Sequence, residues 1–564
     1  MKFAWKIQSE EEKPIRDLLL ANRGILPEET ERFFHLNWDE HLESCWNFRE
    51  MAGAVERLFF ALEHEEKIVI HGDYDADGVS GSALLFESIR DIAIALHRPL
   101  HLAVYLPDRE ADGYGVAMHT VERFAAEKIK LLITVDCGIA VPTEIARAKE
   151  LGIDTIVCDH HQLALELPKA ILLHPLVPGE GVANRWLCGT GVVFKFACAL
   201  FDEARKRGLA IIPGKEKWLL DFVAIATVTD MVPLLGENRL LEHFGLRVLK
   251  KTRRPGLSKI FERARIERES IDAHTIGFQI GPRLNAAGRL ASAQIAFETL
   301  TAKTLEEADP LSEQLEQLNQ KRQRLTDGMF VQAETMIQEV EDAPVHVLWH
   351  ADWHPGIVGL LAGKLVAKTG RPAFAFARSG GHFVGSGRST LGINLVELMQ
   401  SAPHFFVKFG GHPEACGLTI AREETIRDFS EHAKSFVKKF IPSAKEKPEL
   451  RIDAVIPLSM ITEDLTKMIE AMAPFGQKNP EPTFLSRSVT ILDARTVGKT
   501  QAHLRVTVSQ GSRSRFEVIG FGFGNEIRLL SIGKKVDLVY EIHHHEWQGR
   551  RTIQLRLLDF EPND

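Results

Sequence analysis

Apolar and polar residues follow a repeating order of helix and short strand over residues 51–240. The amphipathic stretches AVERLFFALEHEE and TVERFAAEKIK are each followed by a short apolar run, KIVI and LLITV. Short apolar strands that alternate with helices are typical of a parallel sheet whose strands are joined by crossover helices. The pattern therefore predicts an α/β domain over 51–240.

The remaining chain divides into further segments with different patterns. Residues 1–50 are rich in aromatic side chains and are predicted to be a helical N-terminal segment. A helical connector is expected over 241–343, and a second α/β domain over 344–441. The polar stretch 442–449 reads as a linker. Many short β-like runs over 450–564 predict a small β-barrel of OB type.

The connector contains a long polar helix with one apolar stripe. Leu311, Leu315 and Leu318 recur at helical spacing with charged residues opposite, which indicates a helix packed on one side. Asp309 is expected to cap this helix and Pro310 to lie in its first turn. The helical segment is thus predicted over roughly 304–340, with its uninterrupted part beginning near Leu311.

Composition restricts the class of protein without naming a function. Apolar residues make up 45% and charged residues 26% of the 564 residues, as in soluble globular proteins. No apolar run approaches the roughly 20 residues that span a bilayer, and the first residues lack the apolar core of a signal peptide. Six cysteines include no C-x-x-C pair, so we expect a reduced, cytoplasmic protein. The net charge of −8 disfavours uniform coating of duplex DNA but allows a confined basic site.

Acidic and imidazole side chains follow three of the predicted strands. Because ligands bind beyond the carboxyl ends of parallel strands, these groups are expected to converge. A fourth contributor ends the apolar run FVAIATVTD. In chain order the groups are His71, Asp73, Asp75, Asp77, Asp136, Asp159, His160, His161 and Asp230.

So many carboxylates at one edge of a sheet repel one another unless cations neutralise them. Aspartate and histidine without thiolate suit Mn²⁺ or Mg²⁺ better than structural Zn²⁺. Two such ions about 3.5–4 Å apart, with a bridging carboxylate, activate water against phosphoesters. Any single aspartate after a strand could equally be a turn or cap residue. Their occurrence after three strands of one domain favours the two-metal site.

Four motifs in this order resemble those of the DHH phosphoesterase superfamily: HGDYDADG, TVDCGI, DHH and ATVTDMVPL. GSGRS and GGHPEACG resemble its DHHA1 companion domain. GPRLNAAGRL, APFGQKNPEP and EWQGRR narrow the resemblance to the single-stranded-DNA-specific exonucleases of this superfamily. The resemblance covers roughly 60–560; one departure is Ala226, where the family usually has glycine.

The resemblance implies a two-metal-ion exonuclease that degrades single-stranded DNA from 5′ to 3′ into mononucleotides, in DNA repair and recombination. Asp136 would bridge the two ions, His161 would lie near the scissile phosphate, and Asp73 would lie behind the ligands. The implied ligands of Mn²⁺ or Mg²⁺ are His71, Asp75, Asp77, Asp136, His160 and Asp230.

A second set of residues is suited to phosphate. Arg388 lies among glycines and serines in GSGRS, which lets backbone and guanidinium approach an anion together. By the resemblance, Arg388 and Arg109 form the pocket for the 5′-terminal phosphate. The residues of WHPGIVG (353–359) themselves indicate a helix that opens behind glycines and whose N-terminus can face an anion, and His354 could equally be a surface residue. The further substrate-binding candidates are Arg283, Asn285, Arg289, Ser386, Ser389, Gly410, Gly411, His412 and Trp547.

The predicted barrel has a local basic excess with interleaved aromatic residues. From Lys499 to Arg556 there are ten Lys and Arg residues against five acids. A basic groove with stacking aromatics is how OB folds hold single strands without reading sequence. Alternating phenylalanines are also typical of a barrel core, so we expect only Trp547 and one of Phe516, Phe521 and Phe523 to be exposed. His543–His545 are expected to form an exposed turn.

Two other functions remain open from the residues alone. A DHH centre could act on a small substrate such as a cyclic dinucleotide, although the extra β-domain argues against this. A non-catalytic replication scaffold is the other alternative, and the complete set of metal-binding side chains argues against it. The expected partners are single-stranded DNA, a single-strand-binding protein and a DNA helicase. The protein is expected to be a monomer and not to bind a membrane.

Overall fold

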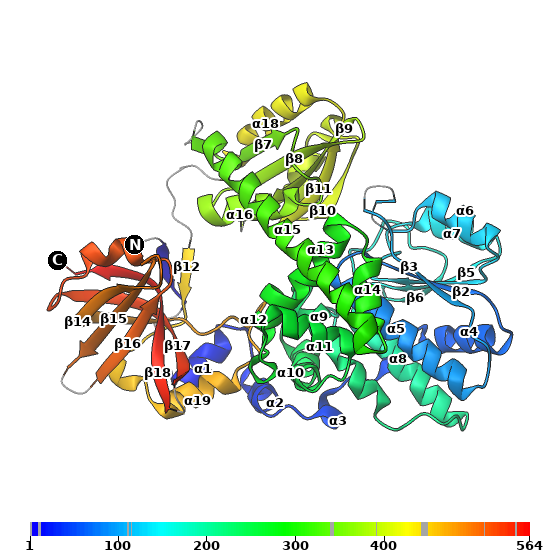
Figure 1. Ribbon diagram of the computed structural model, residues 1–564, viewed down its shortest axis with the longest axis horizontal. Coiled ribbons are helices and arrows are strands. Elements are labelled where there is room, and N and C mark those ends of the chain that lie inside the picture. Colours follow the sequence, from blue (N-terminus) through cyan, green and yellow to red (C-terminus); the bar gives the residue numbers. More distant parts are fainter. Residues whose placement is uncertain are drawn as a thin grey trace. The chain divides into compact units, whose positions relative to one another are not determined.

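The computed structural model describes the chain except residues 1–2, 9–12, 110–111, 114, 339–342, 391, 441–448, 512–513, 548–549 and 564, and the side chains of 546, 547 and 550. The chain forms two compact units (Figure 1). The larger consists of Glu43–Val232 and Leu241–Lys445. The smaller combines Met1–Leu42, Pro233–Leu240 and Glu446–Asp564.

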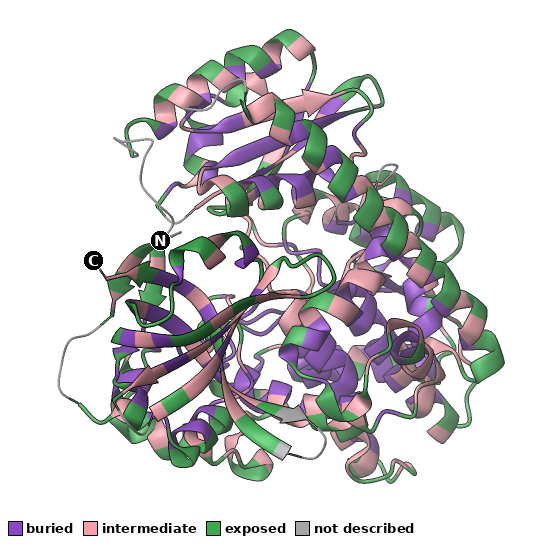
Figure 2. Ribbon diagram, turned by 60° about the vertical axis from the view of Figure 1, so that its left-hand side comes forward, coloured by how far each residue is buried: buried purple, intermediate pink, exposed green. Residues whose placement is uncertain are grey.

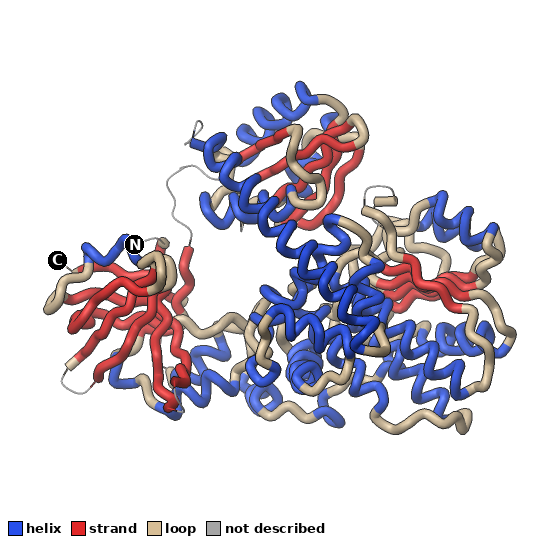
Figure 3. Tube along the Cα trace, viewed as in Figure 1, coloured by secondary structure: helices blue, strands red, loops and turns tan. Residues whose placement is uncertain are grey.

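The larger unit contains a five-stranded, fully parallel sheet, as the sequence pattern predicts. Helices cover both of its faces (Figure 3). The strands, in spatial order, are β3 (Leu102–Tyr105), β2 (Ile68–Gly72), β4 (Leu131–Val135), β5 (Asp154–Cys158) and β6 (Ile171–Leu173). The helices are α4 (Met51–Glu63), α5 (Ala76–Ala95), α6 (Met118–Ala126), α7 (Pro142–Glu150), α8 (Gly189–Lys206) and α9 (Leu220–Thr229). Strands β2 and β4 are buried along their whole length, which matches the apolar runs KIVI and LLITV; Figure 2 colours each residue by its burial.

The connector is helical, but the uninterrupted part of its long helix begins earlier than predicted. Helix α15 starts at Leu305 and contains Pro310. The reason is a cap at Thr304, whose hydroxyl accepts a hydrogen bond from the Glu307 backbone N–H at 3.2 Å. Asp309 instead pairs with Lys259 and Arg263, at 3.2 and 3.0 Å. The connector helices are α10 (Gly236–Lys250), α11 (Pro255–Ala264), α12 (Ala273–Thr275), α13 (Gly281–Leu290), α14 (Gln294–Thr301) and α15 (Leu305–Gln338), with a π-helical turn at Ile276–Ile280.

The second α/β domain has a mixed five-stranded sheet. Strands β7 and β8 are parallel, and the other pairs are antiparallel. The strands, in spatial order, are β10 (Lys408–His412), β11 (Ala415–Ile420), β9 (His382–Arg388), β8 (Ala373–Ser379) and β7 (His346–His350). The helices are α16 (Val358–Thr369), α17 (Leu395–Gln400) and α18 (Glu423–Val437).

The smaller unit is built on the expected OB-type barrel. Strand β14 pairs with both β15 and β17, which closes the sheet on itself. The strands are β12 (Glu449–Ile452), β13 (Ala454–Val455), β14 (Phe484–Val497), β15 (His503–Gln510), β16 (Ser514–Gly520), β17 (Lys535–Trp547) and β18 (Arg550–Pro562); the helix is α19 (Glu463–Ala471). The N-terminal segment is not wholly helical: β1 (Ala4–Ile7) precedes α1 (Ile15–Ala21), α2 (Thr30–Phe34) and α3 (Trp38–His41), and pairs in parallel with β12.

One sequence prediction about the barrel is wrong and another is confirmed. His543–His545 do not form a turn, because they lie within β17 and pair with β18. There His543 contacts Glu481 and Glu541, at 3.3 and 3.4 Å. Phe521 is 60% exposed whereas Phe523 is 5% exposed, so one phenylalanine faces solvent as expected. The side chain of Trp547 lies outside the described part of the structure.

All six cysteines are free thiols. Among the described residues, none of the helices combines the length and apolar character needed to cross a bilayer.

Glu242 of α10 provides a pH prediction. It is fully buried, and neither carboxylate oxygen has a hydrogen-bond partner among the described residues. Burial raises the pKa of Glu242 well above its ordinary value of 4.5. Above pH 4.5 the unfolded chain therefore ionises while the folded protein keeps the proton, so stability falls as pH rises. Glu242→Gln should unfold like the wild type near pH 4 and be more stable at pH 7 by denaturant titration, with a difference growing by at most about 1.4 kcal/mol per pH unit. A difference independent of pH would contradict this assignment.

Candidate metal and phosphate site

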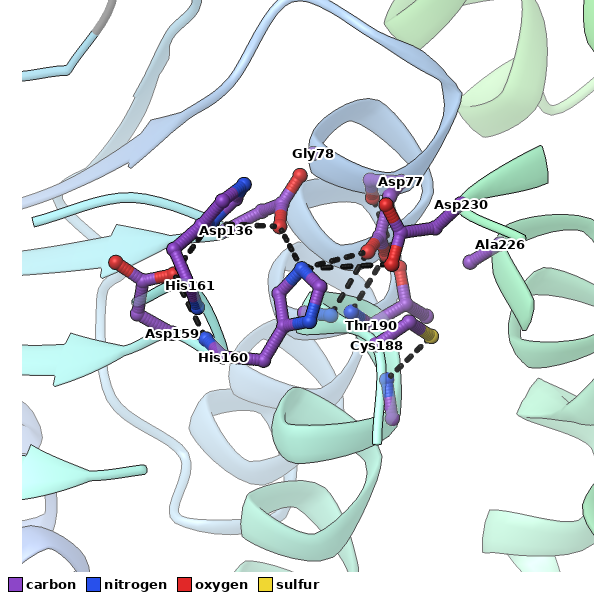
Figure 4. Close-up of polar contacts among 12 residues, drawn as sticks. Asp77, Gly78, Asp136, Asp159, His160, His161, Cys188, Thr190, Ala226 and Asp230 are labelled. Carbon is purple, nitrogen blue, oxygen red and sulfur yellow. Dashed lines mark hydrogen bonds and ion pairs between the residues drawn. The ribbon is translucent and has the colours of Figure 1, made fainter. Parts of the chain in front are cut away.

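The carboxyl ends of β2, β4 and β5 bring the predicted acidic and imidazole groups together (Figure 4). His160 Nε2 lies 3.2 Å from Asp136 Oδ1, 3.4 Å from Asp230 Oδ2 and 4.0 Å from Asp77 Oδ2. Asp230 arrives from the C-terminal end of the buried helix α9. Three triads each place one ligand atom per residue within 4.8 Å of the others: Asp136, His160 and His161; Asp77, His160 and Asp230; Asp73, Asp75 and Asp136.

Asp77 is oriented by the N-terminus of α8, a contact that sequence reasoning missed. Its two carboxylate oxygens accept hydrogen bonds from the backbone N–H groups of Gly189 (2.8 Å) and Thr190 (2.7 Å) (Figure 4). Unpaired N–H groups at a helix N-terminus favour a negative charge. The glycines of CGTG are the sequence feature that marks this helix N-terminus, but no pattern along the chain connects them with Asp77.

Asp136 has an unusual backbone conformation, and its side chain lies against Gly189. Its φ is 60°, in the left-handed region, which aspartate tolerates better than most residues. A Cβ atom at Gly189 would lie 2.5 Å from Asp136 Oδ1. The close approach therefore requires glycine at position 189.

Gly189→Ala should lower kcat by roughly tenfold or more. The added methyl group would push the Asp136 carboxylate out of its position in the cluster, and a misplacement of about 1 Å can lower a catalytic rate by this much. Gly191→Ala is the matched control in the same turn, since its Cβ would meet no atom closer than 3.2 Å. Steady-state kinetics of both variants, with circular dichroism as a check of folding, test the prediction. Equal activity of the two would show that Asp136 is not held by this contact.

The remaining aspartates of the first motif have separate surroundings. Asp75 Oδ1 caps α5 by accepting hydrogen bonds from the N–H groups of Asp77 (3.0 Å) and Gly78 (3.1 Å). Asp73, which was expected behind the ligands, lies within ligand distance of Asp75 and Asp136. The structure thus places Asp73 in the carboxylate cluster itself.

The electrostatics of the cluster fit divalent cations. Burial, followed by repulsion from neighbouring carboxylates, raises the pKa of Asp73, Asp136 and Asp230. Burial lowers the pKa of His71 to about 4, which keeps the imidazole neutral as a ligand must be. His71 Nε2 and Asp73 Oδ1 are buried without a hydrogen-bond partner in the described part of the chain. Carboxylate oxygens that repel one another, together with neutral imidazole nitrogens, are the kind of ligands that Mn²⁺ or Mg²⁺ binds.

Asp159 and His161 form a pair beside this cluster. Asp159 Oδ1 lies 2.8 Å from His161 Nδ1 and accepts the backbone N–H groups of His160 and His161. Burial opposes the charged imidazole, but the hydrogen bond and the charge of Asp159 raise the pKa of His161 to about 9. Burial likewise opposes ionisation of Asp159, yet His161 holds the pKa of this carboxyl below its ordinary value. The first residue of DHH therefore keeps the third one protonated at neutral pH.

His412 brings the second α/β domain to the same place. Its ring is stacked on that of His161, with ring centroids 6.4 Å apart and planes inclined by 24°. Gly411, the preceding residue, has φ 140°, and a Cβ there would lie 2.4 Å from Ala415 O. The β10–β11 hairpin that carries His412 therefore requires glycine at position 411, whereas a Cβ at Gly410 would meet no atom within 4 Å.

Three arginines from distant parts of the sequence lie close enough to repel one another and form a basic cluster, called the arginine pocket below. Burial, together with repulsion from the nearby charges of Arg109 and Arg388, lowers the pKa of Arg289 to about 10. Arg109 stacks over the Tyr74 ring at 5.3 Å. Arg388 Nη1 donates to Ser386 Oγ at 2.8 Å, and the Ser386 hydroxyl donates to Cys416 O at 3.0 Å. All three are partly buried, and partly buried cations that repel one another are suited to bind an anion.

The N-terminus of α16 adjoins this pocket. A Cβ at Gly359 would lie 3.2 Å from both Arg388 Nη2 and Ser386 Oγ, so the helix start approaches the guanidinium closely. The stretch WHPGIVG thus opens a helix, as the sequence predicts, and the start of this helix lies beside Arg388. That its N-terminus faces an anion stays a prediction. Ser389 faces away, since its hydroxyl donates to Ile393 O at 2.8 Å.

Two further candidates lie elsewhere on α13. The Arg283 guanidinium pairs with Glu316 of α15 at 2.7 Å and donates to Gln279 O. Asn285 Oδ1 accepts the backbone N–H of Ala76 at 2.8 Å. Neither side chain is directed into the arginine pocket by these contacts.

Family models match three parts of the chain: the N-terminal domain of the DHH family at 67–227, the DHHA1 domain at 342–439 and the RecJ OB domain at 452–559. The single-stranded-DNA-specific exonuclease RecJ of Bacillus subtilis (strain 168) is 32% identical over 574 residues, which cover 99% of this chain and 71% of that protein. The chain belongs to the RecJ family. This confirms the resemblance seen in the sequence motifs.

Solved RecJ structures have the same fold. RecJ from Thermus thermophilus in complex with Mn²⁺ matches with a TM-score of 0.81 at 26% identity, over 100% of this chain and 80% of that one. The complex with Mg²⁺ matches with a TM-score of 0.77 at 25% identity, over 100% and 79%. The order of domains in this chain is therefore that of known RecJ proteins.

Proposed function

We propose that this RecJ-family protein is a two-metal-ion exonuclease that degrades single-stranded DNA from the 5′ end to mononucleotides, in DNA repair and recombination. The observation that carries the proposal is the cluster of buried aspartates and histidines beside a pocket of three arginines. The chemistry would reside in 51–240 and 344–441, and strand holding in 450–564. The protein would act as a cytoplasmic monomer together with a single-strand-binding protein and a helicase, as the family resemblance implies.

The cluster is suited to hold two divalent ions, and the RecJ structures of T. thermophilus are described as complexes with Mn²⁺ and with Mg²⁺. Such ions, when bound, supply Lewis acidity and lower the pKa of a coordinated water. Asp136 takes part in two of the three ligand triads, which supports a bridging role. The proposed ligands are His71, Asp75, Asp77, Asp136, His160 and Asp230, with Asp73 close enough to join them. His71 belongs to none of the three triads, and its support is the buried Nε2 atom without a hydrogen-bond partner among the described residues.

His161 would act on the scissile phosphate. Because Asp159 engages Nδ1, the Nε2 atom is the nitrogen that would donate to a phosphate oxygen. The raised pKa keeps the ring charged at neutral pH, so it would stabilise negative charge and could give a proton to the leaving oxygen. His412, stacked beside it, would contact the same phosphate region.

The arginine pocket would bind the 5′-terminal phosphate. A terminal phosphate has one more charge and one more exposed oxygen than an internal one, and guanidinium groups bind it through paired, charge-assisted hydrogen bonds. Arg109 and Arg289 reach this pocket from the first domain and the connector, and Arg388 from the second domain. Gripping the end of the strand beside the metal cluster would fix the polarity of degradation.

A labelled oligonucleotide tests the function. With Mn²⁺, a single strand labelled at the 5′ end should release the label at once as a mononucleotide, and a 3′ label only after the strand is shortened. EDTA should stop the release, and the same strand in a blunt duplex should be a poor substrate. Release of the 3′ label first, or equal degradation of the duplex, would contradict the proposal.

A further inference from the structure

Helix α13 rests directly on the loop that carries the first group of aspartates. Asn285 Oδ1 accepts the N–H of Ala76 at 2.8 Å, and Ala76 lies between Asp75 and Asp77. One turn later, a Cβ at Gly288 would lie only 2.3 Å from Tyr74 O. The helix thus fixes the loop by a hydrogen bond and by a contact that glycine alone permits.

The start of the same helix packs on the segment that delivers Asp230. A Cβ at Gly281 would lie 2.3 Å from Thr229 Cγ2, and Thr229 directly precedes Asp230. The turn before α13, Ile276–Ile280, is π-helical, a departure from regular geometry that is frequent at functional sites. The loop that carries Asp75 and Asp77 and the segment that ends at Asp230 therefore both pack against α13.

The end of α13 contacts the second α/β domain. Arg289 Nη1 donates to Gly356 O at 3.2 Å, and a Cβ at Gly356 would lie 2.2 Å from Arg289 O. The Arg289 side chain also adjoins Arg109 and Arg388 in the arginine pocket. One ten-residue helix thereby links two parts of the metal cluster to the phosphate-binding domain.

We infer that α13 is a positioning element of the active site and that Asn285 is a positioning residue rather than a strand contact. Its amide oxygen sets the place of the Ala76 N–H, and through it the separation of the Asp75 and Asp77 carboxylates. The expected change in kcat rests on the proposed function. The expected change in metal affinity is independent of the proposed function.

Asn285→Ala removes the acceptor and should change kcat and metal affinity but not strand affinity. We expect a roughly tenfold lower kcat, since losing one hydrogen bond misplaces the carboxylates without removing any of them. KM for a 5′-phosphorylated single strand should change less than twofold. The Mn²⁺ concentration that half-saturates the rise in Tm of the protein, measured without DNA, should increase several-fold.

Gln294→Ala is the matched control, because Gln294 begins the neighbouring helix α14 and, within the described part of the chain, its side-chain amide bonds only to Glu298, at 3.1 Å. It should match the wild type in kcat, KM and Mn²⁺ response. Asn285→Ala with a tenfold higher KM, unchanged kcat and unchanged Mn²⁺ response would make Asn285 a strand contact and overturn the inference. Behaviour identical to Gln294→Ala would also overturn it. If the wild type released no nucleotides, the proposed function would fail, while the Tm titration would still decide the role of α13.

Discussion

Asp136→Asn is expected to lower kcat at least a hundredfold while the protein stays folded. The amide has the shape of the carboxylate and tolerates the left-handed backbone at φ 60°, so alanine, which tolerates it less well, is the poorer choice. The Asp136→Asn substitution removes the negative charge of a residue that belongs to two of the three ligand triads. A hundredfold loss corresponds to a barrier about 2.7 kcal/mol higher.

The stability of this variant provides an independent test. Neighbouring carboxylates and burial raise the pKa of Asp136, so a neutral amide relieves repulsion and should not lower the Tm of the metal-free protein. The rise in Tm caused by Mn²⁺ should become smaller, because ligand binding to the folded state is weaker. Asp154→Asn is the control at the opposite end of the sheet, where Asp154 pairs with Arg57. More than about a hundredth of wild-type kcat in Asp136→Asn would exclude the bridging role.

Arg388→Ala should slow cleavage of 5′-phosphorylated strands by roughly ten- to a hundredfold. The expected loss follows from charge-assisted hydrogen bonds of about 1.5–3 kcal/mol to the terminal phosphate. Strands with a 5′-hydroxyl should be affected much less, because they lack the charge that the pocket reads. The Mn²⁺ response of the Tm should not change, since Arg388 contacts Ser386 and Gly387 and none of the aspartates by a described hydrogen bond.

Arg378→Ala on the neighbouring strand β8 is the matched control for removal of a guanidinium. Arg378 is exposed to solvent, and its replacement should leave both substrates unaffected. Comparing kcat/KM for the two kinds of 5′ end with each variant gives the answer. An equal loss on both ends in Arg388→Ala would mean that Arg388 holds the strand in general and that Arg109 or Arg289 senses the end.

The sequence by itself determined the elements and the residue types of the site. The apolar runs KIVI, LLITV and TIVC are continuous because parallel strands are buried on both faces, and each delivers its polar groups at the carboxyl end. This local rule is sufficient to bring Asp75, Asp136 and His160 to one edge. The β-barrel was also predictable, because strands and turns alternate with short spacing.

Local patterns failed where a competing contact was distant. Helix α15 begins at Leu305 because Thr304 caps it and Asp309 is engaged by Lys259 and Arg263, which lie about fifty residues away in the sequence. His543 lies in a strand because β18 pairs with that segment. Propensity describes what a segment prefers alone, and tertiary pairing can override it.

Only the tertiary structure decided how the site is held in place. Gly189 lies 112 residues from Asp77, yet its N–H fixes that carboxylate and its missing side chain makes room for Asp136. Asn285 lies 209 residues from Ala76, and the three arginines come from three separate segments. The spacing of residues along a strand or helix fixes which groups a segment can present. Distances between groups in different segments depend on how the segments pack, and no local pattern encodes them.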